Sequence, residues 1–110
     1  MIDTEKRYKI VVYVPSSHAD ALRAAMGDAG AGRIGDYTHC MFTLTGIGQF
    51  KPGEGADPYV GEVGKLNSVE EERIETVCEG GALEAVVRAI RETHPYEEPA
   101  FDVYPIALIA

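Results

Sequence analysis

Two strand-helix units decide the fold, and the first of them is YKIVVYVPSSHADAL, residues 8–22. Its first seven residues are β-branched or aromatic except for Lys9, which is typical of a strand, and Pro15 ends the run. Ser17 then offers a hydroxyl cap with Asp20 three residues later, and this pattern predicts the start of a helix. The apolar residues that follow recur at helical spacing: Ala19, Leu22, Ala25, Met26 and Ala29.

The second unit spans residues 71–93. In the expected strand 71–78, one face carries Ile74, Thr76 and Cys78 and the other carries Arg73, Glu75 and Val77. The expected helix 82–93 has apolar residues at i, i+3, i+4 and i+7, namely Leu83, Val86, Val87 and Ile90. Pro95 ends this helix because a proline lacks the amide hydrogen and pushes the preceding residue out of helical space.

Two more strands complete the order βαββαβ. Residues 37–45 alternate, with Thr38, Cys40, Phe42 and Leu44 on one face and Tyr37, His39, Met41 and Thr43 on the other. We expect Cys40 to be buried on its face, and Tyr8 or Lys9, His39 and Met41 to lie on the open face of the sheet. The last strand is expected at 100–109. This order predicts an α+β, ferredoxin-like sandwich in which both helices cover one face of a four-stranded antiparallel sheet.

Composition and charge narrow the function classes. The 110 residues include 18 acidic and 10 basic side chains, so the formal charge is −8, and one domain over residues 1–110 is expected. This negative charge disfavours binding to nucleic acids, whose phosphates are also negative. The sequence has no apolar run of 18 residues and no apolar leader, so we expect a soluble, cytosolic protein that binds no membrane. The glycine-rich segment 46–67 is long for a loop, and we expect extra short strands in it or a partner that orders it.

The segment His94-Pro-Tyr-Glu-Glu-Pro99 is the most informative candidate site. It is either a ligand or proton-transfer cluster held by two prolines or a helix-to-strand corner, and spacing alone favours the corner. Of the adjacent pair His39 and Cys40, His39 is the better candidate for a metal ligand, because Cys40 is expected to be buried. The alternative for His39 is a hydrogen-bonded histidine at an interface. The three glutamates at 70–72 are interpreted as the solvated start of a strand. The stretch 30–35 matches the GxGxxG motif of dinucleotide-binding sites, but it follows a helix instead of opening one, so we interpret it as the end of that helix.

Several stretches together resemble a known family. They are residues 33–40, 46–52, 61–66 and 94–105, which look like the insert domain of the YqfO branch of the NGG1-interacting-factor family. The resemblance covers roughly residues 8–108. The His-Pro-Tyr-Glu-x-Pro run is also similar to the CutA divalent-cation-tolerance proteins, which share the βαββαβ plan.

The resemblance implies a CutA-like, PII-like domain that assembles as a homotrimer. In the family, the insert sits within a larger hydrolase-like shell with a dinuclear metal site, and the chain resembles the insert alone, so neither the hydrolase label nor the shell's metal ligands carry over. The expected function is a non-enzymatic trimeric binding or regulatory module that takes a divalent metal ion or small ligand at subunit interfaces. The candidate metal ligands are His39, His94, Glu97 and Glu98, and the candidate ligand-binding residues are Tyr37 and Tyr96. The alternatives are a small hydrolase with an interface active site and a domain that only binds a protein partner.

Overall fold

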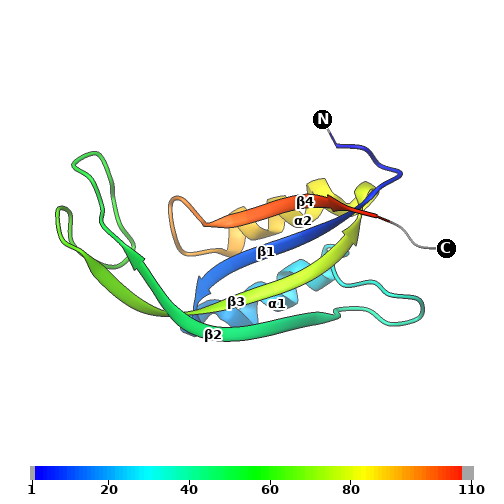
Figure 1. Ribbon diagram of the computed structural model, residues 1–110, viewed down its shortest axis with the longest axis horizontal. Helices are drawn as coiled ribbons and strands as arrows, with labels where there is room; N and C mark the ends of the chain where they lie inside the picture. The colour runs from blue at the N-terminus through cyan, green and yellow to red at the C-terminus, as the bar shows by residue number, and fades with distance from the viewer. Residues whose placement is uncertain (1, 108–110) are drawn as a thin grey trace.

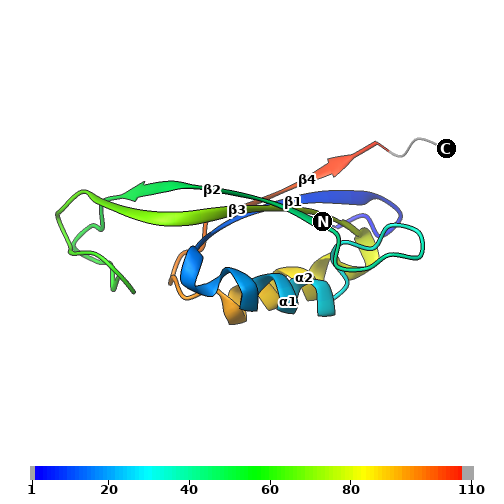
Figure 2. The same ribbon diagram turned by 90° about the horizontal axis from the view of Figure 1, so that it is seen from below.

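The sheet and helices of a computed structural model, which describes residues 2–107, confirm the predicted α+β sandwich (Figure 1). The elements are β1 (Arg7–Pro15), the short 3-10 helix η1 (Ser16–His18), α1 (Ala19–Asp28), β2 (Met41–Phe50), β3 (Asn67–Glu79), α2 (Gly80–Thr93) and β4 (Phe101–Ile106). The strands are ordered β2-β3-β1-β4, and each neighbouring pair is antiparallel. Both helices lie on one face of this sheet (Figure 2). The expected last strand ends at Ile106, and its positions 108 and 109 lie outside the described residues.

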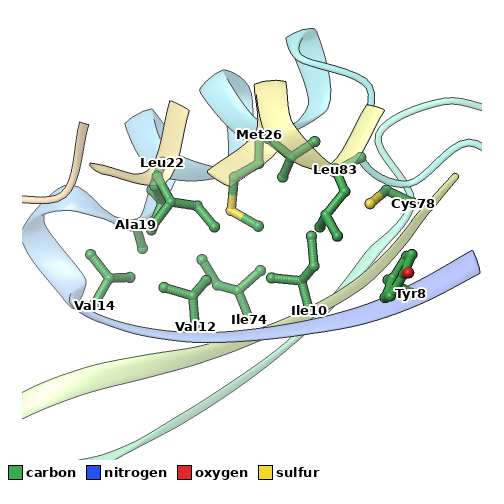
Figure 3. Close-up of a cluster of buried hydrophobic side chains, with 13 residues drawn as sticks. Tyr8, Ile10, Val12, Val14, Ala19, Leu22, Met26, Ile74, Cys78 and Leu83 are labelled. Carbon is green, nitrogen blue, oxygen red and sulfur yellow. The ribbon is translucent and has the colours of Figure 1, made fainter. Parts of the chain in front are cut away.

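The core lies between the sheet and the two helices. Alternate residues of β1 point toward the helices, and they meet the apolar stripes of α1 and α2 (Figure 3). The fully buried side chains include Ile10, Val12, Val14, Leu22, Met26, Ile74, Val86 and Ile90. Burying a side chain of this size contributes roughly 1.5–3 kcal/mol, so the two predicted helix stripes and the strand residues that face them both contribute to the apolar stabilisation. The face of β3 with Ile74, Thr76 and Cys78 is buried, as its alternation predicted.

The orientation of β2 differs from the expectation. Met41 and Thr43 lie opposite the core residues Thr76 and Ile74, so they form the covered face, whereas Phe42 and Leu44 are 62% and 52% exposed on the open face. Met41 and Tyr8 therefore belong to the covered side, whereas Lys9, the other residue expected at the first open-face position, alternates with the core residues of β1 and lies on the open face. Cys40 is only half-buried. The alternation within the strand was correct, but β2 is an edge strand with apolar residues on both faces, and alternation does not say which face the helices cover.

The connection between α1 and β2 explains why β2 begins at Met41 and not at Tyr37. Gly30 and Gly32 have positive φ angles of 119° and 81°, and the amide of Ala31 donates to the carbonyl of Met26, so this GxGxxG stretch ends the helix as predicted. His39 also has a positive φ of 60°, which is incompatible with a continuous strand.

Segment 46–67 lengthens the sheet. The pairing of β2 with β3 continues to Phe50 and Asn67, and this takes the place of the extra short strands expected there. The paired ends form an arm that reaches beyond the helices in Figures 1 and 2. Residues 51–66 connect the two strands without regular structure.

Candidate functional site

The corner between α2 and β4 is built on His94, which is 6% exposed. Its Nε2–H donates to the carbonyl of Tyr13 at 2.6 Å, and its Nδ1 accepts from the amide of Tyr96 at 3.1 Å. Because an amide can only donate, Nδ1 must be unprotonated, and this fixes the neutral Nε2–H tautomer. Burial lowers the pKa of His94, partly opposed by the hydrogen bond to Tyr13 and by the charge of Glu71. His94 therefore ties the corner to β1 through Nε2 and fixes the corner's own backbone through Nδ1.

Tyr96 projects from this corner toward β3. Its hydroxyl donates to Oε2 of Glu71 at 3.0 Å, and its ring lies 5.1 Å from the His94 ring. Burial and this hydrogen bond hold the pKa of Tyr96 well above its usual range. Tyr96 is therefore a permanent hydrogen-bond donor at neutral pH, and it orients the half-buried carboxylate of Glu71.

The 51–66 connection folds back onto the same corner. The amide of Asp57 donates to Oε1 of Glu97 at 2.8 Å, a contact between residues 40 positions apart. The Tyr59 ring lies 6.3 Å from the Tyr96 ring and packs edge-on against His18 at 5.5 Å. The segment that looked too long for a loop is thus attached to the chain's own helix-to-strand corner.

These parts enclose a cleft of about 300 Å³, which we call the corner cleft. Its aromatic walls are Phe50, Tyr59 and Tyr96, and its acidic groups are Glu71, Glu97 and Glu98. The volume is at the lower end of the range for small-molecule sites, which combine apolar walls with a few placed polar groups. Four separate segments contribute: the end of β2, the 51–66 connection, β3 and the α2–β4 corner.

The structure brings together only some of the predicted site residues. Tyr96, Glu97 and Glu98 line the corner cleft, with His94 beside Tyr96. His39 and Tyr37 belong to the α1–β2 connection, at the opposite end of the molecule in Figures 1 and 2. Within residues 2–107, no three His, Cys, Asp or Glu side chains are grouped so that they could hold a metal ion.

The surroundings of His39 and Tyr37 are separate from the cleft. Nε2 of His39 is 2.9 Å from Asp28 Oδ1 and its Nδ1 is 3.0 Å from Thr38 Oγ1, while Tyr37 is 74% exposed. His39 lines a different hollow, beside Gly27 at the end of α1. Both of its ring nitrogens are therefore already hydrogen-bonded.

Among the aromatic and acidic residues of the cleft, sequence reasoning missed Phe50, Tyr59 and Glu71. Phe50 and Tyr59 stand in the segment treated as irregular, and aromatic residues in a polar, glycine-rich stretch were the only available signal. Glu71 belongs to the run expected to be solvated, but it accepts from Tyr96, and the next residue, Glu72, pairs with Arg23 at 2.7 Å. The expectation of a solvated acidic run is thus wrong for two of its three residues.

Comparison with known proteins identifies relatives of this chain and of its fold. No protein-family model matches the chain. It is 52% identical over 104 residues to the GTP cyclohydrolase 1 type 2 homolog of Halalkalibacterium halodurans and 50% identical over 103 residues to that of Bacillus subtilis. These matches cover 94% of the chain but 28% of each relative, so the chain spans about a quarter of the length of the curated relatives it matches.

Solved structures agree with this result. A Bacillus cereus protein related to NIF3 is 48% identical with a TM-score of 0.80, over 93% of this chain and 26% of that protein. The periplasmic divalent cation tolerance protein CutA of Archaeoglobus fulgidus is 15% identical with a TM-score of 0.66, over 94% of this chain and 87% of its own. The first similarity confirms the resemblance to one segment of the NGG1-interacting-factor proteins, and the second confirms a CutA-like fold. Neither helix in the described part of the chain is long and apolar enough to cross a membrane.

Proposed function

We propose that this chain, a homologue of one segment of the NGG1-interacting-factor proteins with a CutA-like fold, is a non-enzymatic binding or regulatory module that takes a small ligand in the corner cleft. Residues 1–110 act as one domain in this proposal. The side chains assigned to ligand contact are Tyr96, Glu97 and Glu98, joined by Phe50, Tyr59 and Glu71. His94 is a positioning residue, because its ring nitrogens are both occupied by backbone groups.

The observation that carries the proposal is the way the cleft is held open by contacts between distant segments. Glu71 is fixed by Tyr96 and Glu97 by the amide of Asp57, so two acidic side chains are oriented before any ligand binds. Such preorganisation reduces the entropy that binding must overcome. A structural corner without a ligand role needs neither the aromatic walls nor the oriented carboxylates.

A fragment titration followed by ¹H–¹⁵N NMR tests the proposal on the intact protein. A set of neutral, anionic and cationic small molecules is expected to include members that shift the amide signals of Tyr96, Glu97 and Asp57. The amide of Glu84, on the outer face of α2, is the internal control. A set that leaves all three cleft amides unmoved at millimolar concentration rejects the ligand-binding function.

We also propose that the module is a homotrimer. The support is the exposed apolar pair Phe42 and Leu44 on the open face of edge strand β2, 62% and 52% exposed, and Ile47 farther along its other face, 73% exposed, together with the two sheet edges left unpaired within the described residues. Exposed edges and apolar patches of this kind mark association surfaces. Light scattering after gel filtration is expected to give about three times the chain mass of 11.9 kDa, and Leu44→Asp is expected to reduce it. A monomer at micromolar concentration rejects the trimer.

A divalent metal ion is the second candidate occupant, with His39, Glu97 and Glu98 as its proposed ligands and His94 as a fourth that would have to give up one of its two hydrogen bonds to backbone groups. The observation in its favour is the exposure of Glu97 and Glu98 at the cleft. Because one chain groups no three ligands within the described residues, such a site needs residues from more than one subunit. Calorimetry with copper, zinc and nickel tests it: heat that is lost in Glu97→Gln and His39→Ala supports the metal, and no heat rejects it.

A further inference from the structure

The lining of the corner cleft combines aromatic walls with negative charge. Phe50 and Tyr59 flank Tyr96 with ring centroids 5.9 Å and 6.3 Å away, and the rings are tilted by 53° and 49°. Rings tilted in this way contact one another edge to face instead of stacking, and all three line the cleft as one aromatic cluster. The face of an aromatic ring carries negative electrostatic potential and attracts a cation within about 6 Å of its centroid.

The charged groups around these rings reinforce the same preference. Glu71, Glu97 and Glu98 are acidic, and Lys51 is the only basic side chain among the described residues that line the cleft. Glu97 uses one oxygen in its hydrogen bond to the amide of Asp57, which leaves the other available to a ligand, whereas Glu71 has Oε2 on the Tyr96 hydroxyl and Oε1 beside Gly48 and contributes its negative charge at the cleft wall. An anionic ligand such as a phosphate ester would meet three carboxylates and one ammonium group, and their net effect is repulsive.

The aromatic rings and the carboxylates of the cleft together favour an organic cation over a metal ion as the ligand. A metal ion needs several ligand atoms converging at about 2 Å, and within residues 2–107 no such group of three side chains exists. An alkylated ammonium ion needs no converging ligands, because its charge is spread over several carbon-bound hydrogens that contact ring faces.

We propose that the corner cleft binds a small organic cation, an alkylated ammonium group held against the aromatic cluster of Phe50, Tyr59 and Tyr96 and neutralised by Glu71 and Glu97. This inference rests on the proposed ligand-binding function and specifies the chemical class of the ligand. The cleft volume of about 300 Å³ sets the size, since it suits a compact head group and not a nucleotide.

Three probes of the same shape and different charge test the class. They are choline, its neutral isostere 3,3-dimethylbutan-1-ol and the anion 3,3-dimethylbutanoate, each titrated into the intact protein and followed at the amides of Tyr96 and Glu97. Choline is expected to bind at least about tenfold more tightly than the neutral isostere, and the anion is expected not to bind.

Matched variants connect the binding to the named groups. Glu97→Gln removes one cleft charge and Tyr59→Leu removes one exposed ring, and each is expected to weaken choline binding about three- to tenfold. Glu84→Gln removes the same charge from the outer face of α2 and is expected to leave the affinity unchanged. Tyr59 is 58% exposed, so its replacement does not depend on the core.

The outcomes separate this inference from the function it rests on. Equal or tighter binding of the neutral or anionic probe overturns the cation but keeps the cleft as a ligand site. Equal weakening by Glu97→Gln and Glu84→Gln also overturns it, because long-range charge alone then explains the preference. If choline fails while other members of the fragment set shift the cleft amides, the inference is wrong and the proposed function stands. If nothing shifts them, both fail.

Discussion

Replacing Gly48 by alanine tests whether Glu71 is held where the structure places it. A Cβ added to Gly48 overlaps the carboxylate of Glu71, whereas a Cβ added to Gly46, two residues earlier on the same strand, meets nothing within 4 Å. The carboxylate is the flexible end of its side chain, so it is expected to move aside instead of breaking the backbone. Movement of Glu71 removes its hydrogen bond to the Tyr96 hydroxyl.

The expected magnitude follows from that one hydrogen bond. A hydrogen bond to a charged group contributes about 1.5–3 kcal/mol, and the lower value applies because Glu71 and Tyr96 are only half-buried. Alanine in place of a strand glycine stabilises by about 0.5–1 kcal/mol through the unfolded chain, and this gain is common to both variants. Gly48→Ala is therefore expected to be less stable than Gly46→Ala by about 1.5 kcal/mol, or ~6 °C in melting temperature for a domain of this size.

The assay is thermal unfolding of both variants at equal protein concentration, so that any self-association affects both melting temperatures alike. In a Tyr96→Phe background the hydrogen bond is already absent, so the difference between the two alanine variants is expected to shrink to a few tenths of a kcal/mol. Equal melting temperatures for Gly46→Ala and Gly48→Ala in the wild-type background would refute the placement of Glu71. A difference that persists in the Tyr96→Phe background would refute the hydrogen bond as its cause.

Three further predictions concern the core and the titratable groups. The pKa of His94 is lowered from 6.5 by burial in the folded chain, so the neutral form stabilises the fold above about pH 6.5, and that stability is lost as the pH falls through the folded-state pKa. Urea unfolding at pH 7.5 and 5.5 is expected to show this loss of stability in the wild type and in His39→Gln but much less in His94→Gln. Equal losses in all three proteins would contradict the assignment of the pH dependence to His94. Burial raises the pKa of Cys78 to about 11, so iodoacetamide at pH 8 is expected to alkylate half-buried Cys40 first in the native protein, and equal rates by mass spectrometry contradict this. Ile74→Ala is expected to cost about 2–5 kcal/mol in urea unfolding because Ile74 is fully buried, and a cost below about 1 kcal/mol argues against its place in the core.

Sequence patterns predicted the elements whose burial is periodic. The stripe of α2 and the alternation of Ile74, Thr76 and Cys78 each have one apolar face, so the pattern identifies the covered side. The same reasoning failed for β2, because Met41 and Phe42 are both apolar and only the position of the helices decides which is covered.

The corner cleft was only half predictable from the sequence. The prolines around Tyr96 and Glu97 indicated a fixed corner, and this part was recognised. Its partners Phe50, Tyr59 and Glu71 reach the corner from segments up to 46 residues away in the sequence, through contacts that no local pattern encodes. A glutamate in an acidic run is indistinguishable from a solvated one until the tyrosine that donates to it is located.

The arm formed by the outer ends of β2 and β3 has a consequence for local dynamics. Its base pairs Gly46 with Glu71 and its tip pairs Phe50 with Asn67, beyond the helices that protect the rest of the sheet. Backbone hydrogen bonds in such a single layer open at a lower free energy than those over the core, so their amides exchange with solvent faster. Phe50 and Glu71 belong both to this arm and to the corner cleft. If the cleft binds a ligand as proposed, that ligand is expected to slow amide exchange along the arm, and by reciprocity a contact that orders the arm is expected to change the ligand's affinity.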